Sequence, residues 1–343
     1  MNDKERFLAS LKLKKVDRVS AACPLQTATV EMMEETGAAW PEAHRDPEKM
    51  ANLASTGRLC FFAANRLAGI ESARVPFDLC VEAETVGSQV SEGRLDSQPS
   101  IRRPAFRKVE AFEDAVCPDP LSDGRMATVV EAVRILAEAD ETVPIIAGIT
   151  GPFTLAGQVR GVETLLMDFF DRMDFVKSLL KYSTNVLKTY GKALVDNGAD
   201  AVVIIDPSAG SELLGTAHYR EMAFPYCKEL VKSLDVPSIL HICGDSKPIL
   251  GMMAETGVNG ISLDHLVDVN ETREFLGDRT AIIGNINPAD TLFLGTPEKV
   301  KKESLECIRK GVNVLSPGCG IPTRTSMKNI KAMVEAARES AGK

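Results

Sequence analysis

Eight short runs of apolar, largely β-branched residues alternate with longer segments of helical periodicity along this chain of 343 residues. The runs occupy residues 19–24, 73–77, 144–149, 201–205, 238–242, 260–263, 281–284 and 313–315. They are apolar on both faces, as buried parallel strands are, and lack the polar alternation of half-exposed strands. The alternation therefore predicts repeated strand–helix units around a parallel sheet.

Helical segments follow the strands from the third onward, at residues 162–195, 219–234, 247–256 and 296–310. Glycines just before strands, as in 196-DNGADAVVIID-206, are typical of helix ends. Eight such units predict an α/β protein with the architecture of a TIM (β/α)8 barrel. A doubly wound open sheet is the alternative, because periodicity does not show closure; however, no Gly-x-Gly-x-x-Gly motif follows an early strand.

The chain shows no internal repeat or low-complexity segment, so we expect one domain over residues 1–343 with an N-terminal helical extension. Residues 81–143 separate the second and third strands by much more than an ordinary crossover. Their first part, residues 81–112, is polar and interrupted by glycine and proline. We predict an insertion near the C-terminal mouth of the barrel, with a small hairpin.

The charge balance restricts the possible partners. Lys and Arg number 40 against 48 Asp and Glu, a net charge of −8, which argues against a nucleic-acid partner. The charged N-terminal segment and the absence of about 18 uninterrupted apolar residues argue against a membrane protein, and we expect a cytoplasmic one. The eight cysteines are then expected to be free thiols or metal ligands, not disulfides.

A histidine and a cysteine end the fifth predicted strand, in 240-LHICG-244. Residues i and i+2 of a strand share a face, so His241 and Cys243 are expected to point the same way at the carboxyl end of the strand. Active sites of barrel enzymes form at that end. The alternative is that both are ordinary core residues of a buried strand.

A second cysteine, Cys319, lies between two glycines in 316-SPGCGIP-322, directly after the last predicted strand. A loop cysteine with flexible neighbours is poorly placed to fill a core. One histidine and two cysteines form a donor set that favours Zn²⁺ and leaves one tetrahedral position open, as in catalytic zinc sites. His241, Cys243 and Cys319 are therefore predicted to bind a catalytic or substrate-binding zinc.

These motifs carry a family resemblance. Together with 36-TGAAWPEAHRDPEKMA-51, 203-VIIDPSAG-210 and 284-GNINP-288, the segments 241-HIC-243 and 318-GCG-320 resemble the methylcobamide:coenzyme M methyltransferases. Those proteins are zinc-dependent TIM barrels of the uroporphyrinogen decarboxylase superfamily, and they take part in methanogenesis. The resemblance implies that the three residues are the zinc ligands.

The same resemblance implies the reaction and its partners. A methyl group would pass from a methylated corrinoid, carried by a separate corrinoid protein, to the small thiol coenzyme M as a zinc-activated thiolate. The acidic residue that approaches the metal in the family corresponds to Asp264, where relatives commonly have Glu. Asp264 is also suited to cap a helix.

Coenzyme M carries a sulfonate, and an anionic tail needs a counter-charge or hydrogen-bond donors. Gln26, Arg74 and Asn285 follow or end predicted strands and are the candidates for this role. Asp206 ends the fourth strand and is a candidate to orient a ligand or a substrate proton. Taken singly, each of these residues also fits a salt bridge or a helix cap.

The sequence is also compared with the requirements of other functions. Uroporphyrinogen decarboxylase depends on an arginine-bearing segment after the first strand, whereas 21-AACPLQTATVEMM-33 has no basic residue. Cobalamin-independent methionine synthase uses a similar zinc set, but its full-length forms have two barrels. The acceptor could also be another thiol or tetrahydrofolate, and a non-enzymatic zinc–thiol sensor is a further alternative. The basic segment 101-IRRPAFRK-108 fits an ordinary solvated loop and, as the alternative, a patch that steers an acidic partner protein.

Overall fold

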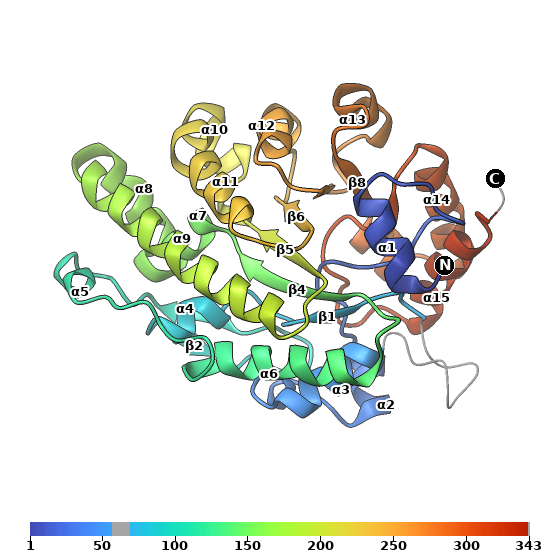
Figure 1. Cartoon of the computed structure of the whole chain (residues 1–343), viewed down its shortest axis with the longest axis horizontal. Helices are drawn as coiled ribbons and strands as arrows, with labels where there is room; N and C mark the ends of the chain where they lie inside the picture. Colours follow the sequence, from blue (N-terminus) through green and yellow to red (C-terminus); the bar gives the residue numbers. More distant parts are fainter. Residues whose placement is uncertain (57–68, 342–343) are drawn as a thin grey trace.

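A curled sheet of seven parallel strands forms the centre of the computed structural model, which describes residues 1–56 and 69–341 (Figure 1). The strand order follows the chain order, without a reversal that would split the sheet into two halves. The strands are β1 (Ala73–Val75), β4 (Ile145–Thr150), β5 (Ala201–Ile205), β6 (Ser238–His241), β7 (Gly260–Ser262), β8 (Ala281–Ile286) and β9 (Val314–Pro317). All seven lie at predicted positions, with ends shifted by one or two residues.

The first predicted strand, residues 19–24, is wrong as a strand. Ser20 forms one isolated parallel bridge with Val314 of β9. Toward β1, the backbone N–H groups of this segment bond to side chains: Ala21 N donates to Glu71 Oε2 (3.1 Å) and Cys23 N to Ser72 Oγ (3.1 Å). Pro24 has no N–H to donate. An extended segment therefore lies between β9 and β1 without a regular ladder.

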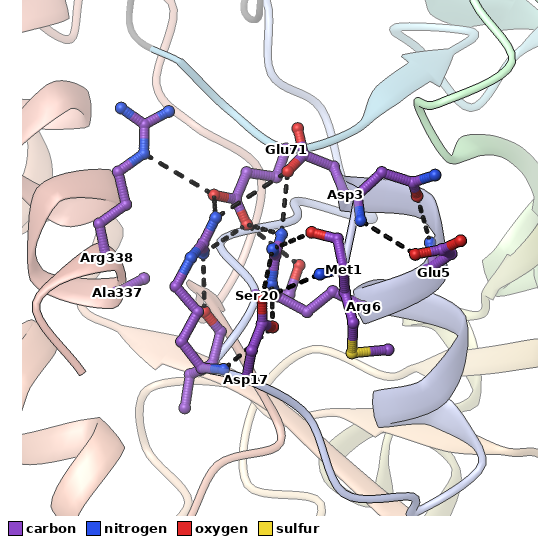
Figure 2. A network of polar contacts seen from close by, with 12 residues as sticks. Met1, Asp3, Glu5, Arg6, Asp17, Ser20, Glu71, Ala337 and Arg338 are labelled. Carbon is purple, nitrogen blue, oxygen red and sulfur yellow. Dashed lines mark hydrogen bonds and ion pairs between the residues drawn. The ribbon is translucent and has the colours of Figure 1, made fainter. Parts of the chain in front are cut away.

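Figure 2 shows the polar network around Glu71, which holds this segment. The buried carboxylate accepts from both terminal nitrogens of Arg18, at 3.0 and 2.5 Å, as well as from Ala21 N. Arg6 of α1 (Asp3–Leu11) and Arg338 of α15 (Met327–Arg338) each lie 3.8 Å from it. One acidic side chain thus joins both terminal helices to the unpaired part of the sheet.

The interior of the curled sheet contains a core of its own. Its members are inward-facing strand residues such as Val203, Ile239 and Ile283, joined by Phe7 and Leu11 of α1. A larger core lies between the outer faces of the strands and the surrounding helices. Helix α1 lies before residues 19–24 as the predicted N-terminal helical extension, and α2 (Val30–Thr36), η1 (Glu42–His44) and α3 (Pro47–Thr56) follow them.

The helices that follow the strands agree with the predicted ones, with breaks. The predicted helix 162–195 is divided at Arg172 into α8 (Val162–Asp171) and α9 (Met173–Asp196), because Arg172 has non-helical φ/ψ angles of −137° and 39°. The remaining elements are α7 (Pro152–Arg160), η2 (Pro207–Ala209), α10 (Ser211–His218), η3 (Tyr219–Ala223), α11 (Phe224–Lys232), η4 (Lys247–Ile249), α12 (Leu250–Glu255), α13 (Val269–Leu276), η5 (Pro288–Phe293) and α14 (Pro297–Arg309). In the described part of the chain, none of the helices has the length and apolar character needed to cross a bilayer.

The long segment between β1 and β4 contains α4 (Val81–Thr85), β2 (Gln89–Ser91), β3 (Ser100–Arg103), α5 (Glu110–Glu113) and α6 (Gly124–Ala139). The predicted hairpin is confirmed, because β2 and β3 pair antiparallel. Its connection meets the loop after β9, where Arg324 contacts Asp96 at 2.7 Å and Thr323 Oγ1 donates to the Asp96 carbonyl oxygen. Its description as an insertion stays a prediction.

Candidate metal centre

His241, Cys243 and Cys319 meet at the carboxyl end of the sheet. Their ligand atoms all lie within 4.8 Å of one another. His241 is the last residue of β6 and is fully buried, Cys243 follows two residues later, and Cys319 lies in the loop after β9. The two half-buried cysteines complete a donor set of one nitrogen and two sulfurs, which suits Zn²⁺.

The orientation of the His241 ring follows from the register of the sheet, which pairs His241 with Ser262 of β7. Nδ1 lies 3.0 Å from the Ser262 carbonyl oxygen and 3.2 Å from its Oγ. A carbonyl oxygen only accepts, so Nδ1 carries the proton in this contact and Nε2 keeps its lone pair. Nε2 lies 3.2 Å from Cys243 Sγ, facing the centre of the donor set.

The pKa values of the two cysteine thiols shift in opposite directions. A hydrogen bond from Cys243, supported by His241, lowers the pKa of Cys319 to about 4 against the opposing effect of burial. The same hydrogen bond, together with burial, raises the pKa of Cys243. The lowered pKa of Cys319 favours its thiolate, and a thiolate donor fits a zinc ion.

Two glycines permit the close approach of the ligand loops. A Cβ atom at Gly318 would lie 2.5 Å from the backbone nitrogen of His265, so no side chain fits there without movement of the backbone. Gly244 has φ = 81°, in the left-handed region that glycine tolerates. These positions explain the glycines that flank the two ligand cysteines.

Asp264 follows β7 and braces the Cys243 loop. Its Oδ2 accepts from Gly244 N (3.0 Å), and its Oδ1 accepts from Leu266 N (3.0 Å) and lies 2.9 Å from His265 Nδ1. The predicted substrate residue Asn285 lies nearby, and its Nδ2 donates to the carbonyl oxygens of Asp264 (2.9 Å) and Val267 (2.7 Å). Asn285 is not among the residues that line the cavity described next.

A cavity of about 120 Å³ lies against the three ligands. It is lined by Leu25, Gln26, Arg74, Phe77, Asp78, Leu79, Gln98, Ile205, His241, Cys243, Cys319 and Gly320. The predicted residues Gln26 and Arg74 are therefore brought to the metal ligands, whereas Asp206, Asp264 and Asn285 are outside the lining. A space of this size admits a small molecule and is far below the roughly 300–1,000 Å³ of drug-sized sites.

Arg74 lies on β1 and is a buried cation in this wall, because only 1% of the residue is exposed. Its terminal nitrogen lies against the backbone of Gly148 on β4, where an added Cβ would approach within 2.3 Å. Burial lowers the pKa of Arg74 to about 10, which leaves it charged at neutral pH. Within residues 1–56 and 69–341, its one hydrogen bond runs from Nε to the Pro24 carbonyl oxygen (3.2 Å), and it forms no ion pair.

Gln26 is also buried and incompletely bonded. Its Nε2 donates to the carbonyl oxygens of Ala28 (3.1 Å) and Ile321 (3.0 Å), which ties the segment after residues 19–24 to the Cys319 loop. Its Oε1 has no hydrogen-bond partner in the described structure. Buried polar atoms are usually paired, so this oxygen and the free end of Arg74 indicate a ligand in the cavity.

Asp206 lies at the end of β5, behind the lining residue Ile205. Its Oδ1 accepts from Thr154 N (2.7 Å), and its backbone N donates to the His241 carbonyl oxygen (3.0 Å). Burial raises the pKa of this carboxyl to about 6. Gly151 leaves room for it, because a Cβ there would lie 2.1 Å from Asp206 Cγ.

Asp78 lines the cavity and was missed by the sequence reasoning. It follows β1 in 73-ARVPFD-78, so the rule that sites form at carboxyl ends of strands could have identified it. Its partners, Arg125 of α6 and His44 of η1, come from distant parts of the chain and carry no local sequence signal.

Fold and site together define a parallel α/β protein with a sulfur-rich candidate metal centre at the carboxyl edge of its sheet. Residues 2–340 match the family model described as uroporphyrinogen decarboxylase (URO-D), and the chain belongs to that family. It is 42% identical over 339 residues to methylcobamide:CoM methyltransferase MtbA of Methanosarcina acetivorans, covering 98% of this chain and 97% of the relative.

Two further comparisons agree. Methylcobamide:CoM methyltransferase MtaA of Methanosarcina barkeri is 37% identical over 339 residues, again with 98% of this chain and 97% of the relative covered. A solved structure described as a methyltransferase from Methanosarcina mazei superposes with a TM-score of 0.94 at 34% identity, covering 99% of each chain. The resemblance predicted from the motifs is confirmed at the level of the family and its methyltransferase relatives.

Proposed function

We propose that this protein transfers a methyl group from a methylated corrinoid to coenzyme M, with the thiol held at His241, Cys243 and Cys319. The observation that carries the proposal is the cavity of about 120 Å³, which has this donor set in one part of its wall and the unpaired cation of Arg74 in another. A short thiol with an anionic tail matches both. The names of the methyltransferase relatives support the same reaction.

The three ligand residues would hold Zn²⁺. Bound zinc supplies a Lewis acid that keeps a substrate thiol deprotonated at neutral pH. His241 contributes a neutral nitrogen whose direction is fixed by the Ser262 carbonyl oxygen. Cys243 and Cys319 contribute sulfur donors, and the lowered pKa of Cys319 favours its thiolate.

Arg74 would bind the acceptor's sulfonate, with Gln26 as a supporting residue of the same wall. Arg74 offers two terminal nitrogens that have no hydrogen bonds to the residues that the structure describes, and an arginine fork suits an oxyanion. Gln26 fixes the wall between Ala28 and Ile321. By holding the tail, Arg74 would orient the sulfur toward the methyl donor.

Three further residues would position parts of the site. Asp264 would direct the Cys243 loop through Gly244 N and compete for the open metal position when no thiol is bound. Asn285 would act on the acceptor through the Asp264 loop. Asp206 would orient the end of β6 through the His241 carbonyl oxygen.

The methyl donor would approach from outside the cavity, because a corrinoid far exceeds 120 Å³. A separate corrinoid protein would therefore present the methyl group at the carboxyl face, beside the β2–β3 hairpin that contributes Gln98 to the wall. We also infer that residues 19–24 take the place of the eighth strand of a TIM barrel, with residues 81–143 as an insertion at its mouth.

Decarboxylation of a tetrapyrrole is the weaker candidate. The family match permits it, but the small cavity and the absence of basic residues in residues 21–33 do not suit a substrate with many carboxylates. Another thiol or tetrahydrofolate as acceptor is tested together with coenzyme M below.

The test is turnover with free methylcobalamin. The purified zinc-loaded protein is incubated with methylcobalamin and, separately, coenzyme M, 2-mercaptoethanol, homocysteine and tetrahydrofolate. We expect loss of the methyl–cobalt absorbance and formation of methyl-coenzyme M, with the highest kcat/KM for that acceptor. Thiol binding without turnover would instead indicate a sensor, and faster methylation of tetrahydrofolate would assign another acceptor.

A further inference from the structure

Asp78 places a negative charge in the same cavity wall as Arg74. Both side chains are buried and both line the cavity, four residues apart in the chain. A carboxylate in this position would compete with an anionic substrate for the guanidinium, since charges interact strongly where water is excluded. The other contacts of Asp78 determine whether Arg74 pairs with this carboxylate or binds the anionic substrate.

Both oxygens of Asp78 are engaged by groups other than Arg74. Arg125 donates to Oδ2 from Nη1 (2.8 Å) and to Oδ1 from Nη2 (3.0 Å), a two-bond ion pair. His44 Nδ1 lies 3.0 Å from Oδ2, and Cys80 N donates to Oδ1 (2.8 Å). Burial by itself would raise the pKa of Asp78, but Arg125 and His44 hold it well below the ordinary value.

The surrounding charges are also matched without Arg74. Arg125 Nε donates to Glu84 Oε2 at 2.5 Å, and Arg45 donates to Glu84 Oε1 at 2.8 Å. Two arginines thus accompany the carboxylates of Asp78 and Glu84. Glu82 accepts from Thr150 N (2.8 Å), and burial raises its pKa to about 7, so it is only partly ionised at neutral pH. Among the described residues, Arg74 forms no ion pair with these carboxylates, although the charges of Asp78 and Glu82 favour its charged form.

We propose that Arg125 is a positioning residue for substrate selection: by holding Asp78 in a two-bond ion pair, it keeps Arg74 available to the anionic group of the acceptor thiol. This inference rests on the proposed function and explains how the site selects an anionic acceptor. Arg125 belongs to α6 and is not among the residues that line the cavity. Its effect on the substrate passes through Asp78 and Arg74.

The removal of Arg125 has a specific electrostatic consequence. Asp78 would lose both hydrogen bonds from Arg125, and Arg74 is the arginine that lines the same cavity. Pairing of Asp78 with Arg74 would neutralise the anion site while leaving the metal ligands in place. Anionic and neutral thiols of equal length should then become similar as substrates.

The experiment compares two thiols of equal length, 2-mercaptoethanesulfonate and 2-mercaptoethanol, with methylcobalamin as donor. The readout is the ratio of their kcat/KM values, and zinc content is measured for each protein. For the wild type we expect a preference of roughly 10- to 100-fold for the sulfonate, the range expected for a charged hydrogen bond. In Arg125→Met this preference should fall by about tenfold or more.

The double variant Asp78→Asn/Arg125→Met separates this effect from a structural one. It removes the competing carboxylate together with its partner, so the preference for the sulfonate should return to within about threefold of the wild type, a difference of less than 1 kcal/mol. A purely structural role predicts that the double variant is at least as impaired as the single one. Arg125→Lys, which cannot form the two-bond fork, should give an intermediate ratio and serves if Arg125→Met does not fold.

The possible outcomes are distinct. An unchanged ratio in zinc-loaded Arg125→Met or Arg125→Lys overturns the inference, as does a double variant with no recovery. Equal use of both thiols by the wild type also overturns it while leaving methyl transfer intact. Methylation of neither thiol by the wild type contradicts the proposed function itself.

Discussion

His241 Nδ1 lies 3.0 Å from the carbonyl oxygen of Ser262, its register partner on the neighbouring strand β7. The contact places the proton of the imidazole on Nδ1 and directs Nε2 toward the two cysteines. Because a hydrogen-bonded sheet and not a loop fixes this ligand, the nitrogen is preorganised for a metal. The sulfur ligands depend instead on two glycine-flanked loops.

The metal ligands are tested by zinc content. We expect about one zinc per chain in the wild type and loss of most of it in His241→Ala and in Cys319→Ala, because only three protein ligands hold the ion. Cys117→Ala is the matched control, since this exposed cysteine is outside the donor set and should leave zinc unchanged. Elemental analysis after dialysis measures the content. Full zinc occupancy in both ligand variants would disprove the assignment.

Asp264 is tested by thiol affinity. Asp264→Ala removes the acceptor of Gly244 N and Leu266 N, so the Cys243 loop should loosen while the three ligands remain. We expect zinc to be retained and the affinity for coenzyme M to change several-fold, within the 10- to 100-fold range typical of residues that support metal ligands. Calorimetric titration measures it. An unchanged isotherm would reduce Asp264 to a helix cap.

Glu71 is tested by stability. Glu71→Gln removes the buried charge that joins Arg18, Arg6 and Arg338, and we expect a loss of roughly 3 kcal/mol in the free energy of unfolding. The melting temperature should fall by several degrees. Glu138→Gln is the control, because its pair with Arg134 is exposed and should contribute less than about 1 kcal/mol. Equal melting temperatures for the two variants would refute the proposal that Glu71 joins the terminal helices to the sheet.

The basic segment is tested with two methyl donors. Arg102 and Arg103 end β3 and are exposed, and Arg107 and Lys108 nearby are exposed as well. Arg102→Glu/Arg103→Glu should lower the rate with a methylated corrinoid protein and make it less dependent on salt, because steering charges act on association. The rate with free methylcobalamin should stay nearly constant. Equal losses with both donors would show that the segment shapes the site and does not steer a partner.

The strand–helix alternation was sufficient to predict the sheet. Buried parallel strands produce continuous apolar runs, which is why β4, β5 and β8 lie where the sequence places them. Residues 19–24 have the same apolar pattern but not the ladder, because Glu71 and Ser72 side chains take their N–H groups. Side-chain acceptors from a distant segment leave no trace in local periodicity.

The metal ligands were predictable for a related reason. The period of two places His241 and Cys243 on one face, and parallel topology brings the loop after β9 to the same edge. Among the substrate candidates, Arg74 and Gln26 reach the cavity, whereas Asn285 turns its amide to two backbone carbonyls. The Asp78–Arg125 pair could not be foreseen, because 47 residues separate its members.

Binding of the thiol to the metal is measured by zinc K-edge X-ray absorption of the zinc-loaded protein with and without coenzyme M. We expect two sulfur ligands in the resting protein, from Cys243 and Cys319, and three after the thiol is added. A sulfur count that stays at two with saturating coenzyme M would contradict the claim that the thiol is bound and activated at the metal.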